Sequence, residues 1–342
     1  MNKAITISDV AREAQVSIST VSRVLNRQHT GDPKLRERVL KIAEKFDYKP
    51  NAAARSLAGG GEASRSMGFV MHSLISLGTY FGDVLRGAEE EAQTQGYGLY
   101  FSTANENLGV LSTGSEPKGL SGKAVGGVIY TGVLPDDFYQ EVHEAGIPLV
   151  LINTYSPGEI DDCVMCDNFS SSYRAIKWLV ELGHRRIACI ACETGNISTD
   201  ERVMGYRQAL LDAGIEFDSA LFPRAEDFLP QHGYRAMERM TQLSSRPTAV
   251  FGVVDELAVG AIQCAREVGL RVPEDLSVIG MNDLEMAQIC DPPLTTVRIF
   301  REEMGRVAVK RLVELIQNPQ QRARRIDVLC ELVKRASCAP VS

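Results

Sequence analysis

The sequence predicts an α/β protein with a small all-α helix-turn-helix domain followed by a larger doubly wound α/β domain in two subdomains. Residues 1–49 hold three short helical patterns and no strand pattern. From residue 66 onward, short apolar strands alternate with amphipathic helices, as in parallel sheets covered on both faces. This alternation is too long for one sheet, so we expect two subdomains with a cleft between them.

Capping residues and apolar spacing define the three amino-terminal helices. Thr6 and Asp9 form an acidic variant of the capping box at the start of the first helix. After the turn "AQV", Ser17 can cap a second helix, and Asp32-Pro33 starts the third. The predicted inward residues are Ile7, Val10 and Ala14 on the first helix, Val21, Val24 and Leu25 on the second, and Leu35, Val39, Ile42, Ala43 and Phe46 on the third.

The charge of the chain is unevenly distributed. Residues 1–60 carry 11 Lys and Arg against 6 Asp and Glu, although the whole chain has a net charge of −7. A small basic module on an acidic body indicates a polyanion partner at one end only. Two helices joined by a short turn, the second polar and basic outside, can place that second helix in a DNA major groove. A three-helix protein-binding domain is the alternative interpretation.

Strand and helix patterns alternate in a regular order through the body. We predict strands at 67–72, 97–102, 126–131, 148–153, 185–192, 248–253 and 276–281, and helices at 79–95, 135–145, 200–214, 231–244, 255–269 and 301–317. Ligands in such folds bind beyond the carboxyl ends of the strands. Residues 107–127 are crowded with Gly, Ser and Pro, so any helix there is short, and "GLSGKA" lacks features of a phosphate-binding loop.

Two cysteine pairs have the spacing of a zinc ribbon. The eight cysteines, without a secretion signal, are expected to be reduced thiols. The pairs Cys163/Cys166 and Cys189/Cys192 lie in strand patterns, where residues three apart point to opposite faces. We therefore predict core cysteines and no metal site.

Catalytic and targeting motifs are not found. The five histidines are scattered, and neither a GxSxG elbow nor an HExxH pair occurs, so we expect no catalytic residues and no cofactor. An apolar leader at the amino terminus and a run of about 18 apolar residues are also missing, which favours a cytoplasmic protein without a membrane partner. A periplasmic solute-binding protein would need such a leader.

Four groups of residues make the sequence resemble the lac repressor family of bacterial transcription regulators over essentially its whole length. They are "ITISDVAREAQVSISTVSRVLN", "NAAARSLAGG", "LGHRRIACI", and "RVPEDLSVIGMND" with "PPLTTV". The resemblance implies a helix-turn-helix DNA-binding domain at 1–49 and a hinge helix at 50–60. It further implies an effector-binding and dimerisation domain at 61–342, of the periplasmic-binding-protein type I fold, with subdomain crossovers near 167, 297 and 330.

The function implied by this resemblance is that of a repressor. It would bind a pseudo-palindromic operator as a homodimer, in the cytoplasm at the nucleoid, under the control of a sugar, sugar acid or sugar phosphate. The chain ends without leucine heptads, which favours a dimer over a tetramer. The alternative is a sugar-binding or sugar-modifying protein whose amino-terminal module binds another protein.

Matching positions imply the DNA contacts. Ile18 and Ser19 would be the variable base readers, and Arg23 would contact a base. The hinge would contribute Asn51, Ala54 and Leu57, with Leu57 wedged into the minor groove. Gln15 departs from the glycine usual in the family's turn, at a cost of about 1 kcal/mol if the residue keeps a left-handed conformation. The remaining positions would mostly contact the DNA backbone: Thr6, Ser17, Thr20, Ser22 and Asn26.

Matching positions also imply an effector site. Aromatic rings suit stacking on a ligand ring, although core packing is the alternative, and Arg202 can grip a carboxylate bidentately. Asn153 and Asn282 stand where relatives often have aspartates, which makes the site less negative. We therefore expect an acidic effector, unless Asp283 turns inward. The implied residues are Tyr80, Phe81, Asn153, Asp167, Ser198, Arg202, Phe228 and Asn282.

Overall fold

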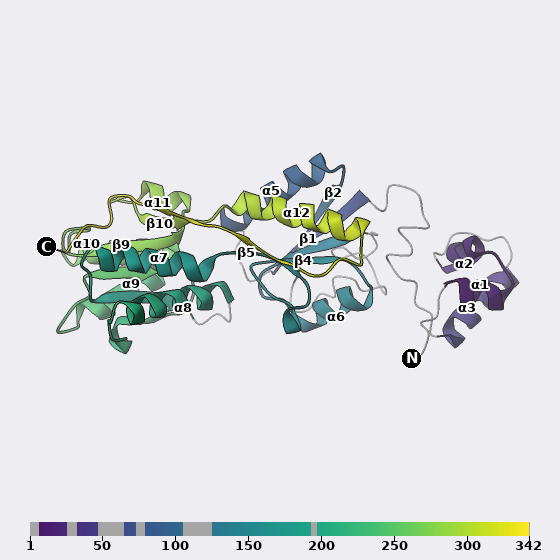
Figure 1. The fold of residues 1–342 in the computed structure, drawn as a ribbon, viewed down its shortest axis with the longest axis horizontal. Coiled ribbons are helices and arrows are strands. Elements are labelled where there is room, and N and C mark those ends of the chain that lie inside the picture. Colours follow the sequence, from purple (N-terminus) through teal and green to yellow (C-terminus); the bar gives the residue numbers. More distant parts are fainter. Residues whose placement is uncertain are drawn as a thin grey trace.

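The computed structural model describes residues 7–25, 33–46, 65–72, 79–104, 125–192 and 197–341. These residues form a three-helix unit and two α/β subdomains (Figure 1). Each subdomain is built on its own six-stranded sheet, so the predicted fold class is confirmed. In the described part of the chain, the helices are too short or too polar to cross a membrane.

The three-helix unit comprises α1 (Ile7–Ala14), α2 (Ile18–Leu25) and α3 (Pro33–Lys45). The third helix begins at the predicted proline. Apolar side chains at helical spacing meet in one small core, as the sequence pattern predicted. This core contains Val10, Ala11, Ala14, Val21, Val24, Val39 and Ala43, with Val16, Ile42 and Phe46 packed against it.

The turn between α1 and α2 is fixed by backbone and side-chain hydrogen bonds. Gln15 has φ of 54°, the left-handed conformation considered for it. The Val16 amide donates to the Ala11 carbonyl at 3.1 Å and the Gln15 amide to the Arg12 carbonyl at 3.2 Å, a Schellman motif. The Ser17 hydroxyl accepts from the Thr20 amide at 3.2 Å. Ser17 therefore caps α2, which confirms the predicted helix start.

The left-handed turn leads to a stability prediction. Gln15→Gly should stabilise the three-helix unit by about 1 kcal/mol or slightly less, because glycine adopts a positive φ without a Cβ penalty. Slower amide hydrogen exchange in α1 and α2 of the full-length chain would show this. Gln208→Gly in the middle of a helix is the control and should destabilise its own helix by about 1 kcal/mol. Faster exchange in α1 of the Gln15 variant would contradict the expectation.

The first sheet is entirely parallel, with the strand order β11-β5-β4-β3-β1-β2. Its strands are β1 (Ser66–His72), β2 (Gly98–Ala104), β3 (Gly127–Thr131), β4 (Leu149–Ile152), β5 (Asp162–Cys166) and β11 (Arg325–Val328). Helices α5 (Thr79–Thr94) and α12 (Arg301–Gln317) cover one face, and α6 (Asp136–Glu144) covers the other (Figure 1). Gly87 on α5 and Gly305 on α12 let these two helices touch, since a Cβ on either glycine would clash with the backbone of the other helix.

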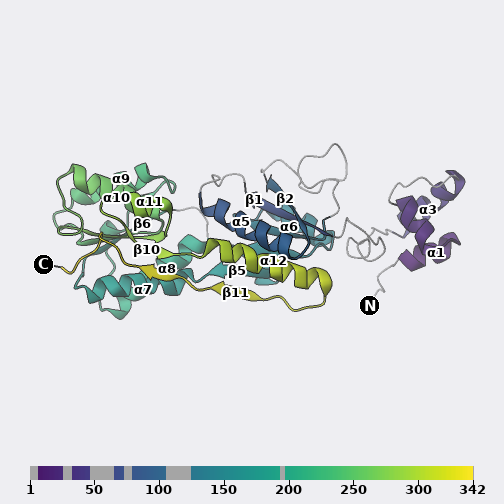
Figure 2. The same ribbon diagram turned by 90° about the horizontal axis from the view of Figure 1, so that it is seen from above.

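The second sheet has the order β12-β10-β9-β8-β6-β7, with only the β12 and β10 pairing antiparallel among the described strands. Its strands are β6 (Ile187–Cys192), β7 (Arg224–Ala225), β8 (Ala249–Gly252), β9 (Ser277–Asn282), β10 (Thr295–Arg298) and β12 (Glu331–Val333). Helices α7 (Asn168–Glu181) and α8 (Ile197–Asp212) pack together on one face. Helices α9 (Pro230–Thr241) and α10 (Asp255–Glu267) cover the other, with the short α11 (Glu285–Ile289) nearby (Figure 2).

The chain passes between the two sheets three times. It crosses after β5, returns after β10 to form α12 and β11, and crosses again before β12. Each sheet therefore receives its last strand from the carboxyl-terminal part of the chain. The connections lie side by side at one end of each sheet, so a movement of one subdomain relative to the other changes all three.

Most predicted strands and helices are confirmed to within about three residues. Helix α7 was not predicted. The strand prediction for both cysteine pairs is correct, because Cys163 and Cys166 lie in β5 while Cys189 and Cys192 lie in β6. Cys163 packs in the core beneath α6 and Cys166 in the core on the other side, as expected of strand residues three apart. Most of the Gly/Ser-rich stretch 107–127 lies outside the described residues.

Candidate DNA interface and ligand cleft

The three-helix unit exposes cations and two large apolar side chains. Ile18, at the start of α2, is 47% exposed, and Leu40 on α3 is 42% exposed. Four cations of α3 are exposed, as predicted: Lys34, Arg38, Lys41 and Lys45. Such a surface suits phosphate contacts around a helix that reads base edges.

The predicted DNA contacts fall partly inside and partly outside the described residues. Ser17 and Thr20 lie at the amino-terminal end of α2, with their hydroxyl oxygens 2.8 Å apart. Ser19, Ser22 and Arg23 belong to α2, but their side chains are outside the described part of the structure. Their roles stay predictions. The remaining residues lie outside the described ranges: Thr6, Asn26, Asn51, Ala54 and Leu57.

The eight predicted effector residues gather where strands end and helices begin. Tyr80 and Phe81 lie in the first turn of α5, Asn153 follows β4, and Asp167 follows β5. On the second subdomain, Ser198 and Arg202 lie in the first turns of α8, Phe228 precedes α9, and Asn282 ends β9. In a parallel α/β sheet this edge is where ligands bind, so the placement fits a cleft between the subdomains.

Tyr80 and Asn153 form a polar contact on the first subdomain. The Asn153 side-chain amide donates to the Tyr80 hydroxyl at 2.5 Å, and its oxygen accepts from the Cys166 amide at 3.1 Å. The Tyr80 and Phe81 rings meet edge to face with centroids 5.0 Å apart. Burial raises the pKa of Tyr80, partly offset by the guanidinium groups of Arg202 and Arg301. The Tyr80 hydroxyl is therefore a neutral group close to two cations, Arg202 of the second subdomain and Arg301 at the start of α12.

Arg202 is buried in the second subdomain. Its Nε donates to Asn168 Oδ1 at 2.9 Å, and its Nη1 donates to the Val253 carbonyl at 2.7 Å. Gly205 lies one turn later on α8, where a Cβ would meet the Phe169 carbonyl at 2.3 Å. The missing side chain lets α8 approach α7 closely, and this brings Arg202 to Asn168. Neutral acceptors therefore hold the guanidinium in place.

Other predicted residues have different surroundings. The Asp167 carboxylate caps α7 by accepting from the Ser170 amide at 3.1 Å, and it lies 3.8 Å from Arg174. The Asp167 carboxylate therefore stabilises the start of α7. Phe228 is half-buried and packs against the main core, and Ser198 is buried in the first turn of α8.

Asn282 and Asp283 differ in the hydrogen bonds of their side-chain oxygens. Asp283 accepts from Arg298 Nε at 2.7 Å and from Arg335 Nη2 at 2.6 Å, so its charge is already compensated. Asn282 is 5% exposed, and its Oδ1 has no hydrogen-bond partner among the described residues. Of the two, Asn282 has the free acceptor.

Sequence reasoning missed Glu256 in the first turn of α10. Its Oε2 is buried without a hydrogen-bond partner in the described ranges. Burial raises its pKa, although Arg202 and Arg301 partly oppose this effect. The sequence signal that could have identified Glu256 is its place as an acidic residue three positions after the predicted strand 248–253. Glu256 and Asn282 thus offer two buried acceptors at the ends of neighbouring strands.

Arg301 also escaped prediction, and it joins the two subdomains. Its Nη2 lies 2.8 Å from the Asp83 carboxylate on α5, and its Nη1 donates to the Asn282 carbonyl at the end of β9. The guanidinium also lies over the Tyr80 ring, 5.8 Å from the centroid. Arg301 therefore contacts residues of both subdomains, and a movement of one subdomain relative to the other would change these contacts.

Glu201 forms a second connection across the cleft. It accepts from the Tyr155 hydroxyl of the first subdomain at 3.0 Å and from Asn168 Nδ2 at 3.1 Å. Arg325 of β11 lies 3.7 Å from the same carboxylate. A hydrogen-bond network thus holds the subdomains together beside the predicted effector residues.

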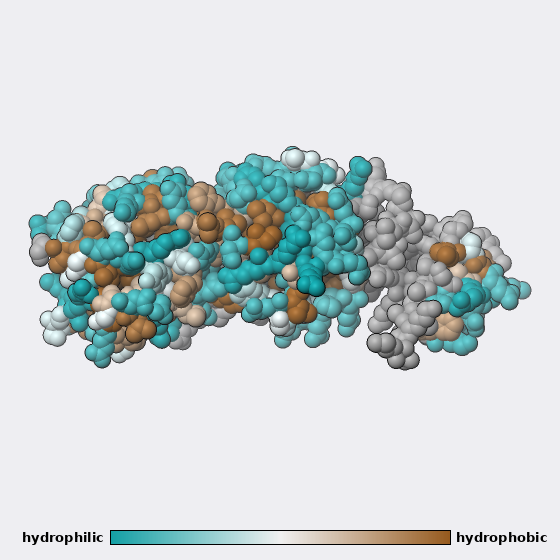
Figure 3. All heavy atoms as spheres, viewed as in Figure 1, coloured by the Kyte–Doolittle hydropathy of each residue, from teal (hydrophilic) through white to brown (hydrophobic). Residues whose placement is uncertain are grey.

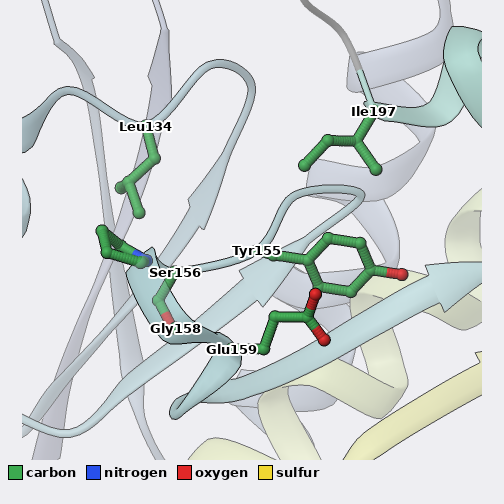
Figure 4. A pocket seen from close by; sticks show the side chains of 7 residues that line it. Leu134, Tyr155, Ser156, Gly158, Glu159 and Ile197 are labelled. Carbon is green, nitrogen blue, oxygen red and sulfur yellow. The ribbon is translucent and has the colours of Figure 1, made fainter.

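A hollow of about 550 Å³ opens at the edge of this network. Leu134 and Ile197 lie on opposite sides of it, with Tyr155 between them (Figure 4). None of the eight predicted effector residues lines it, but Ile197 adjoins Ser198 and Tyr155 follows Asn153 closely. We interpret the hollow as the outer margin of the cleft between the subdomains.

Comparison with known proteins agrees with both halves of the structure. Residues 6–51 match "Bacterial regulatory proteins, lacI family", and residues 176–338 match "Periplasmic binding protein-like domain". The HTH-type transcriptional repressor PurR of Mannheimia succiniciproducens is 32% identical, with 98% of this chain and 99% of that protein covered.

Two solved structures resemble the whole chain. The transcriptional regulator CelR in complex with cellobiose has a TM-score of 0.72 and 29% identity, covering 97% of this chain and 99% of that one. The lac repressor dimer bound to operator and the anti-inducer ONPF has a TM-score of 0.68 and 27% identity, covering 98% and 100%.

A helix-turn-helix unit joined to a two-subdomain α/β body with polar residues in the cleft defines a ligand-controlled DNA-binding regulator. The chain belongs to the lacI family of bacterial regulatory proteins. It is a transcriptional repressor controlled by a small-molecule effector.

Proposed function

We propose that the protein binds a pseudo-palindromic operator as a homodimer, with α2 of each copy in the major groove and Leu57 of each hinge wedged in the minor groove. The exposed Ile18 and the cationic face of α3 support this mode of binding. The lac repressor, whose structure covers 98% of this chain, was solved as a dimer bound to its operator. Such a repressor works at the nucleoid in the cytoplasm, where its operator lies.

Exposed apolar side chains support the dimer. Ile289 and Leu229 of the second subdomain are 76% and 48% exposed, and Phe101 on the edge strand β2 is 43% exposed. Figure 3 shows apolar side chains exposed among hydrophilic ones on both α/β subdomains. Burial of such side chains against a second copy is favourable.

The proposed effector is a sugar-derived acid, such as a sugar acid or sugar phosphate, bound between the carboxyl ends of the two sheets. The observation that carries this proposal is the buried Arg202 guanidinium, whose hydrogen-bond partners among the described residues are neutral oxygens. An anionic group would complete its charge balance. Glu256 and Asn282 would accept hydrogen bonds from the hydroxyl groups of the same ligand.

Calorimetric titration tests the charge of the effector. We expect D-gluconate or D-glucose 6-phosphate to bind the full-length protein more tightly than D-glucose or D-ribose. Arg202→Lys should weaken acid binding roughly 10- to 100-fold, because a charged hydrogen-bond pair contributes about 1.5–3 kcal/mol and lysine lacks the fork.

A matched control comes from the same helix. Arg207 lies 4.5 Å from the Phe217 ring centroid, away from the residues of the cleft, so Arg207→Lys should leave the titrations unchanged. Tight binding of a neutral sugar, without measurable binding of acids, would refute the acidic effector.

The contacts between the two subdomains suggest how ligand binding affects the DNA-binding units. Arg301 contacts Asp83 on α5 of the first subdomain and Asn282 at the end of β9 in the second, while Glu201 contacts Tyr155 between the same two subdomains. A ligand that bonds to Asn282 would act directly on the segment that Arg301 holds. We propose that ligand binding changes the relative position of the subdomains and thereby the spacing of the two hinges.

A further inference from the structure

Glu256 contributes a carboxylate that lacks a donor. The residue lies in the first turn of α10, the helix that follows β8. Its Oε2 is buried and has no hydrogen-bond partner in the described part of the chain. A buried carboxylate oxygen without a donor is unfavourable, so it marks a place where a ligand can supply the missing hydrogen bond.

Two guanidinium groups act on this carboxylate, but both are held by other partners. Arg202 Nη1 donates to the Val253 carbonyl at 2.7 Å, three residues before Glu256. Arg301 Nη2 lies 2.8 Å from the Asp83 carboxylate. Both cations lower the pKa of Glu256, but this effect is smaller than that of burial, which raises it. The charge of Glu256 is therefore near two cations, although neither donates to its Oε2.

Asn282 supplies a second acceptor next to the start of α10. It ends β9, the strand that pairs with β8. Two residues earlier in β9, Gly280 lies directly against the start of α10, since a Cβ there would meet Asp255 Oδ1 at 2.3 Å. The side chain of Asn282 is buried, and its Oδ1 also has no hydrogen-bond partner among the described residues. Two oxygens that need donors thus lie at the ends of neighbouring strands.

The charges in this part of the cleft call for a ligand with charges of both signs. Arg202 is a buried cation held by neutral oxygens, and Glu256 is a carboxylate without a donor at Oε2. A purely anionic ligand would balance Arg202 but bring a second negative charge close to Glu256. A protonated amine carries a positive charge and three donors, so it can serve both Glu256 and Asn282.

We infer that the effector is zwitterionic: an amino sugar that also carries an acid group, with its ammonium group on Glu256 and its acid group on Arg202. This inference rests on the proposed function, because it keeps the sugar-derived acid and places an amine where one hydroxyl group would otherwise donate. Asn282 Oδ1 is the second acceptor of the ammonium group. Amino sugar phosphates and amino sugar acids are the chemical classes that meet these requirements.

Calorimetric titration of the full-length protein at pH 7 tests the inference with four probes. They are D-glucosamine 6-phosphate, D-glucose 6-phosphate, D-glucosamine and D-glucose. The two phosphates differ only in the amine or hydroxyl group at one carbon. We expect the amine to tighten binding roughly 10- to 100-fold, the range for a hydrogen bond between charged groups. N-acetyl-D-glucosamine 6-phosphate, whose nitrogen is uncharged, should lose this gain.

A conservative variant assigns the gain to Glu256. Glu256→Gln keeps the shape of the side chain and removes its charge, so most of the difference between the two phosphates should disappear. Glu267→Gln is the matched control on the same helix. Glu267 is exposed at the other end of α10 and accepts from the Tyr234 hydroxyl at 2.7 Å, so its replacement should leave the difference unchanged.

The titrations separate failure of this inference from failure of the proposed function. Equal affinity for the two phosphates, or a gain that persists in Glu256→Gln, would overturn the zwitterionic ligand and leave the acidic effector in place. If phosphate adds nothing to the binding of either sugar, the acidic effector fails, and the zwitterion fails with it. Absence of binding for all four probes would overturn both. The wild-type protein alone distinguishes equal affinity from the expected gain, so this outcome does not depend on the folding of a variant.

Discussion

Replacement of Arg311 by alanine should lower the free energy of unfolding by about 3–5 kcal/mol, the range for a buried ion pair that loses one partner. Arg311 on α12 is 1% exposed at its side chain and pairs with Asp162, the first residue of β5. The guanidinium also donates to Glu314 at 2.7 Å and to the Arg322 carbonyl at 2.9 Å. Alanine would leave the Asp162 carboxylate buried with little compensation.

Urea denaturation followed by far-ultraviolet circular dichroism measures this loss. Arg306 is the matched control on the same helix, since its ion pairs are more exposed and Arg306→Ala should cost only about 1 kcal/mol or less. The double variant Arg311→Met with Asp162→Asn should recover most of the stability, because it removes both buried charges while Asn can still accept from the Arg324 amide. A loss no larger than that of the Arg306 variant would contradict the predicted role.

Arg23→Ala should weaken binding to the specific operator by about 2–6 kcal/mol, or roughly 30-fold to 10⁴-fold. The estimate combines about 1–3 kcal/mol per base contact with two half-sites in a dimer. Binding to shuffled duplex DNA should fall far less, since only one cation per copy is lost.

Fluorescence anisotropy at fixed salt, with an operator selected from random duplexes, compares the two affinities. Arg38→Ala is the control: this exposed cation of α3 is expected to contact phosphate, so its loss should weaken specific and shuffled DNA alike. Equal weakening of both DNAs by Arg23→Ala would refute the base contact.

Local features of the fold were predictable because neighbouring residues determine them. Ser17 caps its helix, Pro33 starts another, and Gln15 takes the left-handed conformation that the turn requires. Strands with uniformly apolar residues, such as 187–192, are buried and were found for the same reason.

Helix α7 shows where the periodicity of apolar residues was insufficient. Its buried face includes Asn168, Ser171 and Ser172 together with Ala175, Ile176 and Leu179. Small and polar residues occupy the first turns because α8 packs closely against them at Gly205. The apolar stripe therefore begins only in the second half of the helix, and sequence periodicity alone does not reveal its start.

The candidate site was predictable in position but not in its contacts. The residues that follow strands were expected at the cleft, and the structure places them at the carboxyl ends of strands and in the first turns of helices. Arg301, Glu256 and Glu201 were not expected, because their importance arises from partners far away in the sequence, such as Asp83 and Tyr155. Asp167 matched a family position, yet its carboxylate caps a helix.

The three crossings also bear on how the protein is made. Strands β11 and β12 complete the two sheets and come from residues 325–333, so neither sheet can close until almost the whole chain has left the ribosome. In the described part of the chain, the three amino-terminal helices share a core formed by residues 10–46, and such local contacts can form early. A nascent chain thus carries a folded DNA-binding unit before it can sense any ligand, and premature termination after α12 would leave both sheets of the sensor incomplete.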